Sequence, residues 1–381
     1  MKRWLLVLLA LCMLCVAGLA FAEETTLLAL NVGKADCLLL ESGSTRYMID
    51  TGTAESWGTV SAALRIRGIT HLDGVILTHT DKDHAGGLWP LAMSGVTVDH
   101  WYASAYYTDV KTSKHPMVLA AALREEEITW LKAGDSLTID GGTIAVLGPV
   151  EPNDDSENDN SLVLYVETKA GTMLLTGDME FAEERTLLAA KTLKHADVLK
   201  VAHHGRDDAT SSSLVRNVTP QVAVISTSTA ERDDTPAESV VSLLTSYGAE
   251  VVVTQDAGEG VLVTLTDGTA SVTMLPDAQL PAEASGVVIS DRSNAQDTVS
   301  IRNNGEAAVD LSGWYLYSDR GKEIFVFPEG TTIAPEQTIN IGTLSTPGET
   351  DLLWPDENVW HDKKEDTAYL FDAYGREMDS L

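Results

Sequence analysis

The chain has 381 residues and a formal net charge of −31, from 57 acidic and 26 basic side chains. This length allows two domains and a sizeable hydrophobic core. No run of basic residues is longer than Lys363-Lys364, so the composition excludes a surface that attracts polyanions outside a locally positive site.

Residues 1–22 have the pattern of a targeting segment. Lys2 and Arg3 provide a basic start, residues 4–19 an apolar stretch, and Ala20-Phe21-Ala22 a small-x-small cleavage site. A transmembrane anchor is the alternative, but the stretch is short for a membrane span and ends at that site. We therefore expect a signal peptide, cleavage after Ala22 and a secreted chain without a stable membrane span. Cleavage would leave 24 basic and 57 acidic residues, a net charge of −33.

Cysteine usage points to a fold without disulfides. Of the 3 cysteines, only Cys37 lies beyond residue 22. A secreted chain with one cysteine has no internal disulfide and depends on its hydrophobic core. Cys37 falls in an apolar run, so we expect a buried small hydrophobic residue.

The first part of the chain alternates strands and helices. The apolar patterns predict strands at 26–32, 37–41 and 46–49, a helix at 56–67, and a buried strand at 74–77. Asp50 directly follows the third of these strands; from composition alone it is nearly as well explained as a turn residue.

The stretch after the strand at 74–77 carries the strongest chemical signal. It reads Thr-His-Thr-Asp-Lys-Asp-His-Ala-Gly-Gly over residues 78–87 and includes His79, Asp81, Asp83 and His84. Imidazoles and carboxylates at this density suit Zn²⁺, or Mn²⁺ given the share of carboxylates. The two glycines let the backbone pass close to whatever the cluster holds. A solvated polar loop is the alternative, which four ligand side chains within six positions disfavour.

Two later strand ends carry further candidate ligands. Strands at 161–167 and 172–176 lead to Gly177-Asp178, and an apolar strand at 197–201 leads to His203-His204. Paired histidines at the end of a strand are rarely structural, because two half-polar rings there need partners. We expect Asp178 and at least one of the two histidines to bind metal.

The remaining elements up to residue 275 continue the alternation. Further strands are predicted at 96–101, 128–131, 221–226, 251–254, 260–266 and 269–275, a hairpin at 135–147, and helices at 85–93 (with Pro90 as an interruption), 117–126, 180–190 and 236–247.

Several motifs together resemble the metallo-β-lactamase superfamily in its ComEC (competence protein) variant. They are His-x-Asp-x-Asp-His-x-Gly-Gly at 79–87, Val-Gly-x-x-Asp at 32–36, Ile-Asp-Thr-Gly at 49–52, Asn-Ser-Leu-Val-Leu at 160–164 and His-His-Gly at 203–205. Arg206 replaces a usual Ser, and Asp234-Thr235-Pro236 replaces a usual Gly-His-Pro. The resemblance covers residues 26–275 and implies an α/β fold, the αββα sandwich of two packed sheets with helices outside.

The resemblance also implies the site and its cofactors, two divalent ions, Zn²⁺ or Mn²⁺. His79 and Asp81 would bind the first ion, and Asp83 and His84 the second. Asp178 would bridge the two ions, and His203 or His204 would complete the ligands of the second ion. Asp50 would support the loop. The nucleophile would be a hydroxide between the ions, with Asp83 and Asp178 as catalytic residues. The superfamily's fullest ligand set contains one more ligand, and this chain has no clear counterpart for it. The only histidines between residues 88 and 177 are His100 and His115, and neither lies at the expected strand end. Asp159, Asn160 or water would then replace the missing ligand.

The last hundred residues predict a different architecture. Residues 276–285 have the composition of a linker, and beyond them short strands at 298–301, 307–311, 314–317, 324–327 and 338–341 alternate with turns. This part resembles the lamin-tail domain, a small all-β immunoglobulin-like sandwich. The predicted organisation is therefore a signal peptide at 1–22, a hydrolase domain at 23–275, a linker at 276–285 and a lamin-tail-like domain at 286–381.

The leading functional hypothesis is an exported metallo-hydrolase of phosphodiester bonds. DNA is the substrate that the resemblance suggests, but the acidic surface disfavours it. Alternatives are a lactone, a small ester or a cell-wall phosphodiester as substrate, and a non-catalytic module that binds metal or wall polymer. β-Lactam hydrolysis is disfavoured because Asp81 replaces a histidine. We expect a monomer, with a cell-wall or surface ligand for the C-terminal domain.

Overall fold

The computed structural model describes residues 24–230, 234–284, 286–361 and 364–381. The predicted signal peptide at 1–22 lies outside these residues. Within the part that is described, no helix combines the length and hydropathy needed to cross a membrane.

The first sheet contains eight strands, and its central strands position residues 78–87, here called the metal loop. In spatial order these are β17 (Thr269–Leu275), β16 (Gly260–Thr266), β1 (Glu24–Leu30), β2 (Leu38–Ser42), β3 (Thr45–Ile49), β5 (Gly74–Leu77), β7 (Trp101–Ser104) and β8 (Ile128–Leu131). Strands β3, β5, β7 and β8 are parallel, so their carboxyl ends meet at one edge. Asp50 and the metal loop follow β3 and β5 at that edge.

The second sheet contains seven strands and packs against the first. Its order is β15 (Glu250–Val253), β14 (Val222–Ile225), β13 (Val198–Lys200), β12 (Gly171–Leu175), β11 (Val163–Thr168), β10 (Gly142–Gly148) and β9 (Ser136–Ile139). One buried cluster joins the two sheets, with Leu38 and Ile76 from the first and Leu164 and Val224 from the second. Burial of these apolar side chains away from water stabilises the sandwich.

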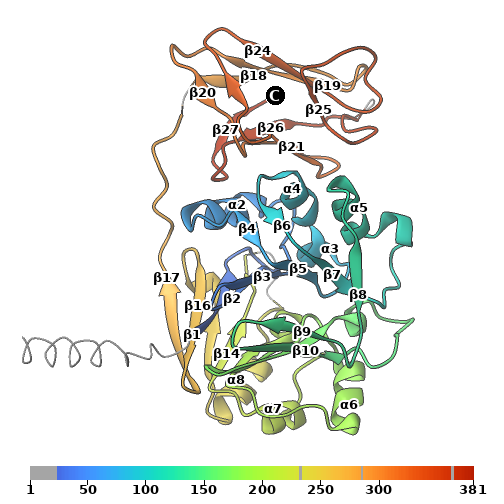
Figure 1. The fold of residues 1–381 in the computed structure, drawn as a ribbon, viewed down its shortest axis with the longest axis vertical. Coiled ribbons are helices and arrows are strands. Elements are labelled where there is room, and N and C mark those ends of the chain that lie inside the picture. Colours follow the sequence, from blue (N-terminus) through green and yellow to red (C-terminus); the bar gives the residue numbers. More distant parts are fainter. Residues whose placement is uncertain (1–23, 231–233, 285, 362–363) are drawn as a thin grey trace, which may run out of the picture.

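Helices cover the outer face of each sheet (Figure 1). The first sheet is covered by α2 (Trp57–Ile66), α3 (Lys82–Ala85), α4 (Leu88–Met93) and α5 (Pro116–Leu123), the second by α6 (Phe181–Ala190), α7 (Ser212–Val218) and α8 (Glu238–Ser246). Short elements complete this part: strands β4 (His71–Leu72) and β6 (Thr97–Val98), and 3₁₀ turns η1 (Thr112–Lys114), η2 (Asn158–Asn160), η3 (Ala202–Gly205) and η4 (Thr254–Asp256). The predicted αββα architecture is confirmed.

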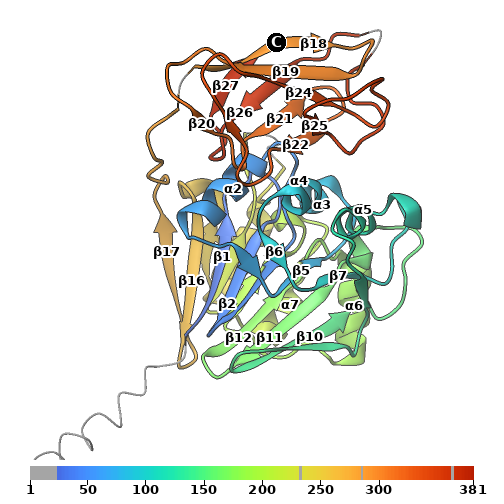
Figure 2. The ribbon, with the colours of Figure 1, turned by 45° about the horizontal axis from the view of Figure 1, so that its top comes forward.

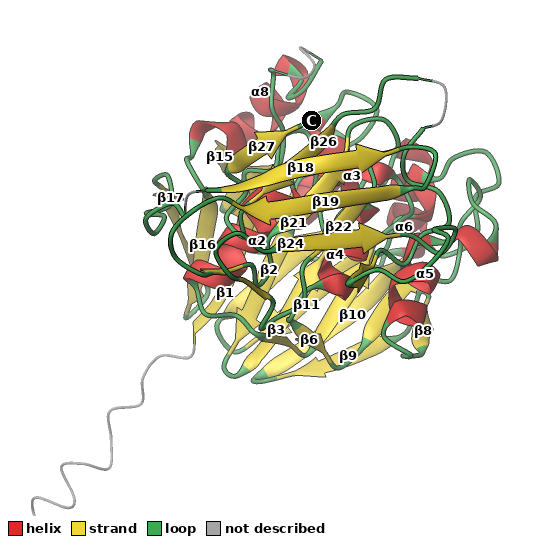
Figure 3. Cartoon of the chain, turned by 90° about the horizontal axis from the view of Figure 1, so that it is seen from above, coloured by secondary structure: helices red, strands yellow, loops and turns green. Residues whose placement is uncertain are grey.

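The C-terminal part is built from strands alone among its described residues. One sheet contains β18 (Val287–Ser293), β19 (Thr298–Asn303), β24 (Thr338–Gly342) and β25 (Leu352–Leu353), and the facing sheet contains β22 (Ile324–Val326), β21 (Tyr315–Ser318), β26 (Ala368–Phe371) and β27 (Glu377–Ser380). A short pair, β20 (Val309–Asp310) and β23 (Thr332–Ile333), lies beside them. Figure 3 shows β18, β19 and β24 side by side. A separate apolar core between the sheets gives the predicted all-β sandwich.

The C-terminal sandwich rests directly on the helices of the first sheet (Figure 2). Tyr315, Tyr317, Ile324 and Val326 belong to the same buried cluster as Trp57 and residues of α4. Side chains alternate across a strand, so the odd-numbered residues of β21 face α2 and α4 while Leu316 lies in the sandwich's own core. The two parts therefore share a hydrophobic interface.

Candidate metal centre

The metal loop leaves the end of β5 and is held by hydrogen bonds on both sides. The Thr78 backbone N and Oγ1 donate to the Asp50 carboxylate, at 2.8 and 2.7 Å. The Thr80 backbone N and Oγ1 donate to Oε1 of Glu157, at 3.0 and 2.6 Å. Asp81 then stands at the N-cap of α3 with extended backbone, and α3 carries Asp83 and His84. The supporting position predicted for Asp50 is the one that the structure shows.

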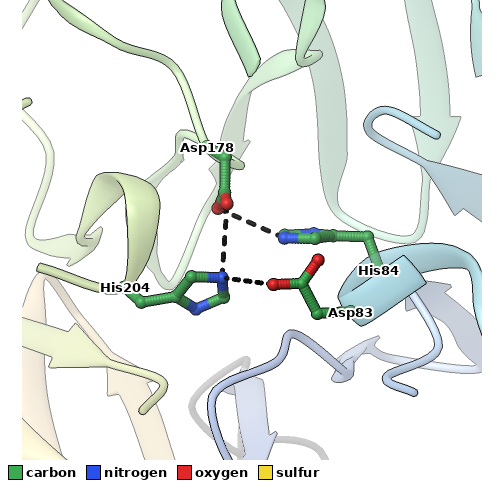
Figure 4. A group of neighbouring side chains, drawn as sticks. All are labelled: Asp83, His84, Asp178 and His204. Carbon is green, nitrogen blue, oxygen red and sulfur yellow. Dashed lines mark ion pairs between the residues drawn. The ribbon is translucent and has the colours of Figure 1, made fainter. Parts of the chain in front are cut away.

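Four side chains from three segments, one of them this loop, converge at one point (Figure 4). They are Asp83 and His84 from α3, Asp178 after β12, and His204 from η3, and their ligand atoms lie within 4.8 Å of one another. His84 Nε2 lies 3.2 Å from Asp178 Oδ1. His204 Nε2 lies 3.2 Å from Asp178 Oδ2 and 3.4 Å from Asp83 Oδ2. Asp178 thus lies between the two imidazoles.

Each of the two imidazoles is oriented by a partner at its other nitrogen. His84 Nδ1 lies 2.7 Å from Asp50 Oδ2, and His204 Nδ1 lies 2.8 Å from the Ser226 carbonyl oxygen. A partner at Nδ1 fixes the ring so that Nε2 is free to bind a metal. Both Nε2 atoms are buried without a hydrogen-bond partner, as is Asp178 Oδ1.

The charges of the cluster stabilise one another. Burial opposes ionisation of Asp178, but the charges of His204 and His84 outweigh it and hold its pKa well below the usual range. Burial also works against the charged form of His204, yet Asp178 raises the pKa of His204 to about 9. The pKa of His84 is likewise raised, because the charges of Asp178 and Asp50 overcome the effect of burial. The cluster therefore holds protons at neutral pH that a divalent cation would replace.

The pair predicted for the first metal, His79 and Asp81, lies next to this group. His79 is buried, its ring centroid is 4.1 Å from that of His84, and its Nε2 has no hydrogen-bond partner. His79 Nε2 is 3.7 Å from Oδ2 of Asp81. Among the described residues, however, the groups of three or more ligand atoms within 4.8 Å of one another contain neither His79 nor Asp81.

The two neighbouring histidines of η3 have different surroundings. His203 and His204 both have left-handed backbone, at φ 48° and 55°, and their rings diverge. His203 Nδ1 lies 2.9 Å from Asp208 Oδ1 and 3.7 Å from Glu180 Oε1, and its Nε2 is 4.0 Å from Asp178 Oδ2. Of the two alternatives left by the sequence, the structure places His204 in the four-residue cluster.

The replacements considered for the missing ligand are engaged elsewhere. Asn160 Oδ1 accepts from the Asn153 backbone N at 2.8 Å, and its Nδ2 donates to the Asn153 carbonyl oxygen, also at 2.8 Å. Asp159 Oδ1 accepts from the backbone N of Glu180 and of Glu183, both at 3.0 Å, at the start of α6. His115 caps α5, and His100 is exposed. Asn160, Asp159 and His115 therefore hold a loop or a helix end.

Sequence reasoning missed a buried ion pair behind the cluster. Lys200, on β13, has no exposed surface, and its Nζ lies 2.6 Å from Oδ2 of Asp36, which is also buried. The Asp36 backbone N donates to the Asp83 carbonyl oxygen at 3.0 Å, so Asp36 also contacts the metal loop. The sequence contained a signal for this ion pair, because Lys200 lies inside the apolar strand predicted at 197–201. A cation buried in such a strand needs a buried partner of opposite charge.

The donor set fits divalent cations. It combines imidazole nitrogens with carboxylate oxygens, as Zn²⁺ and Mn²⁺ prefer. Three of its four side chains are buried, the Nδ1 atoms of its imidazoles have partners, and three of its atoms lack a hydrogen-bond partner. Buried polar atoms without partners are costly, and a bound cation would satisfy all of them.

Comparison with known families agrees with the fold. A family model described as the metallo-beta-lactamase superfamily matches residues 30–229, and one described as the lamin tail domain matches residues 281–381. The chain belongs to the metallo-beta-lactamase superfamily and carries a C-terminal lamin tail domain.

Its curated relatives include proteins named for competence and recombination. ComE operon protein 3 of Bacillus subtilis is 31% identical over 249 residues, which cover 60% of this chain and 32% of the relative. Recombination protein 2 of Haemophilus influenzae is 29% identical over 235 residues, 60% of this chain and 28% of the relative. Competence protein ComA of Neisseria gonorrhoeae is 25% identical over 238 residues, which cover 62% of this chain and 32% of the relative. The chain therefore spans about a third of the length of these relatives.

Solved structures with some likeness include the metallo-beta-lactamase fold protein YhfI from Bacillus subtilis. The two chains are 15% identical, the alignment covers 64% of this chain and 99% of YhfI, and the TM-score is 0.40. A diphosphatase from the PhnP family is 14% identical; the alignment covers 64% of this chain and 98% of the diphosphatase, and the TM-score is 0.39.

Proposed function

We propose that the chain is an exported, metal-dependent phosphodiesterase. Asp83, His84, Asp178 and His204 would hold one divalent ion, and His79 and Asp81, with Asp178 as the bridge, a second. The observation that carries this proposal is the convergence of four ligand side chains, three of them buried, with two Nε2 atoms that lack a hydrogen-bond partner. Zn²⁺ and Mn²⁺ are the ions that this donor set suits.

Divalent ions at such a site activate water as a nucleophile and neutralise negative charge on a phosphate group. The chain's own residues supply orientation. Asp50 and the Ser226 carbonyl oxygen hold the two imidazoles with Nε2 toward the site. Asp83, whose side chain is 29% exposed, lies on the solvent side of the cluster and would orient the attacking water. Asp178, buried between His84 and His204, would contribute to the binding of both ions and so hold the ligands of the two ions together.

Two features bear on the substrate. The relatives are named for competence and recombination, which supports a phosphodiester, with DNA as one candidate. Residues 23–285 carry a net charge of −22, obtained as −33 for residues 23–381 less −11 for residues 286–381. This charge opposes approach of a long duplex, so we favour a short or small phosphodiester. A cell-wall phosphodiester meets the same requirement, and a lactone or small ester is the alternative chemistry.

Export is part of the proposal and is supported by the pattern of residues 1–22. A basic start, an apolar stretch and a small-x-small site are features of a signal peptide. N-terminal sequencing of the protein recovered from the culture medium would identify Glu23 as the first residue. Recovery of the uncleaved chain in the cell would contradict export.

Phosphodiesterase activity is tested with bis-p-nitrophenyl phosphate. The purified protein is assayed metal-free and after addition of Mn²⁺ or Zn²⁺, beside His204→Ala and a matched control, His100→Ala, whose histidine is exposed. We expect metal-dependent turnover in the wild type and the control, and loss in His204→Ala. Absence of turnover with either metal in a folded protein would contradict a phosphodiesterase; lactones would then be assayed.

A further inference from the structure

A cavity of about 270 Å³ lies where the C-terminal sandwich meets the loop before α2. Its walls contain none of the residues assigned to the metal centre. The lining residues are Ala54, Glu55, Tyr315, Tyr317, Asp319, Lys322, Tyr369, Phe371 and Glu377. This volume is enough for a small organic molecule, and such sites occur preferentially between domains.

One wall of the cavity is aromatic. The strand register places Tyr315 opposite Phe371 and Tyr317 opposite Tyr369, so all four rings lie on the face of the sheet that is turned toward α2. The ring centroids of these pairs are 4.8 and 6.3 Å apart, and those of Tyr369 and Phe371 are 6.2 Å apart. Tyr369 and Phe371 are only half-buried, so part of this aromatic face is open to the cavity.

The remaining walls are acidic. Three carboxylates, those of Glu55, Asp319 and Glu377, line the cavity together with one cation, Lys322, which leaves a formal charge of −2. Negative ring faces and carboxylates act in the same direction, because both attract a cation.

The chain already places a cation in this environment. Lys322 Nζ lies 5.4 Å from the ring centroid of Tyr317, 3.3 Å from Asp319 Oδ1 and 3.5 Å from Glu55 Oε1. The Lys322 side chain is 46% exposed and sits on a flexible stem. It can therefore leave when another cation arrives.

We propose that this cavity, here called the aromatic cavity, binds an organic ammonium ion, with Lys322 as an internal competitor. Aromatic rings favour bulky, weakly hydrated ammonium groups such as quaternary amines. A neutral sugar could stack on the same rings and donate hydroxyl hydrogen bonds to the carboxylates, but it has no positive charge for the rings and carboxylates to attract. A small metal ion would gain nothing from the rings. The combination of rings and acids is what selects the organic cation.

The test is calorimetric titration of the purified protein with choline, in EDTA so that the metal centre plays no part. The matched control ligand is 3,3-dimethyl-1-butanol, which has the shape of choline without its charge. We expect choline to bind and the alcohol to give no signal. Lys322→Gln should bind choline roughly tenfold more tightly, and Tyr369→Leu roughly tenfold more weakly.

Three outcomes would overturn the proposal. Equal binding of choline and the alcohol would mean an apolar cavity without charge recognition. Binding of glucose or cellobiose but not choline would mean a stacking surface for sugars. No binding of choline by the wild type or by Lys322→Gln would mean no ammonium site at all. Since Lys322 is half-exposed, Lys322→Gln is expected to fold, and far-ultraviolet circular dichroism checks this for both variants.

Discussion

Single residues in this molecule are buried with charges that their surroundings must balance. Glu183, at the start of α6, is 5% exposed, and its Oε1 accepts from the Val150 backbone N at 3.0 Å. Burial raises the pKa of Glu183 from its ordinary 4.5 to about 7, against the effect of that hydrogen bond. The folded protein therefore binds a proton more tightly at this position than the unfolded chain does.

This shift predicts a pH dependence of stability. A raised carboxyl pKa contributes stability that is fully present below about pH 4.5 and is lost as pH rises through about 7. Glu183→Gln keeps the hydrogen-bond acceptor and removes the titration. We expect the variant to match the wild type at pH 4 and to be more stable by about 3 kcal/mol at pH 8, because one unit of pKa shift corresponds to about 1.4 kcal/mol. Urea unfolding at both pH values measures this, and an equal difference at both would contradict it.

At the scale of elements, the site is formed where two sheets meet, and a buried ion pair links them. Lys200 comes from β13 of the second sheet, and Asp36 from the turn before β2 of the first, at 2.6 Å. Removing one partner of such a pair leaves an uncompensated buried charge, whereas replacing both by apolar groups is often neutral.

We expect Lys200→Met to destabilise the metal-free protein by about 3–5 kcal/mol. The double variant Lys200→Met with Asp36→Leu should recover most of this loss. Urea unfolding in EDTA compares the wild type, the single variant and the double variant. If the double variant is as unstable as Lys200→Met alone, Lys200 contributes through packing and not through its charge.

Much of the element order was predictable from local patterns, and the site only in part. The loop at 79–84 was recognisable because its ligands are close in sequence. His203 and His204 could not be separated, because their left-handed backbone angles decide which ring points inward. A single helix interrupted by Pro90 was predicted over 85–93; the structure instead ends α3 at Ala85 and places Pro90 in the first turn of α4, where no intrahelical N–H is required.

At the scale of the whole molecule, the C-terminal sandwich is packed onto the hydrolase. Gly58 of α2 meets Gly375 so closely that a Cβ on Gly58 would lie 2.6 Å from Gly375 Cα. Ser61 Oγ donates to the Ala373 carbonyl oxygen at 2.9 Å, and Arg65 pairs with Glu329 at 2.7 Å. The signal for this contact was the run Trp314-Tyr315-Leu316-Tyr317, in which both faces of a strand are apolar.

Gly58→Val should therefore separate the two parts. The added side chain meets Gly375 and the Tyr315 hydroxyl, which would lie 2.6 and 2.8 Å from its Cβ, closer than atoms can pack. We expect faster proteolysis between residues 276 and 285 and a larger radius of gyration by X-ray scattering. The control is Ile66→Ala on the same helix, where the side chain is 42% exposed. Unchanged proteolysis and size in Gly58→Val would contradict the packed arrangement.

We expect the cluster around Asp178 to hold divalent metal, and the most direct test of this is the metal content of the protein. The wild type, His204→Ala, His203→Ala and the exposed control His100→Ala are loaded with Zn²⁺ or Mn²⁺, desalted and measured by inductively coupled plasma mass spectrometry. We expect two ions per chain in the wild type, His203→Ala and His100→Ala, and loss of at least one ion in His204→Ala. No bound metal in the folded wild type, or unchanged content in His204→Ala, would contradict this expectation.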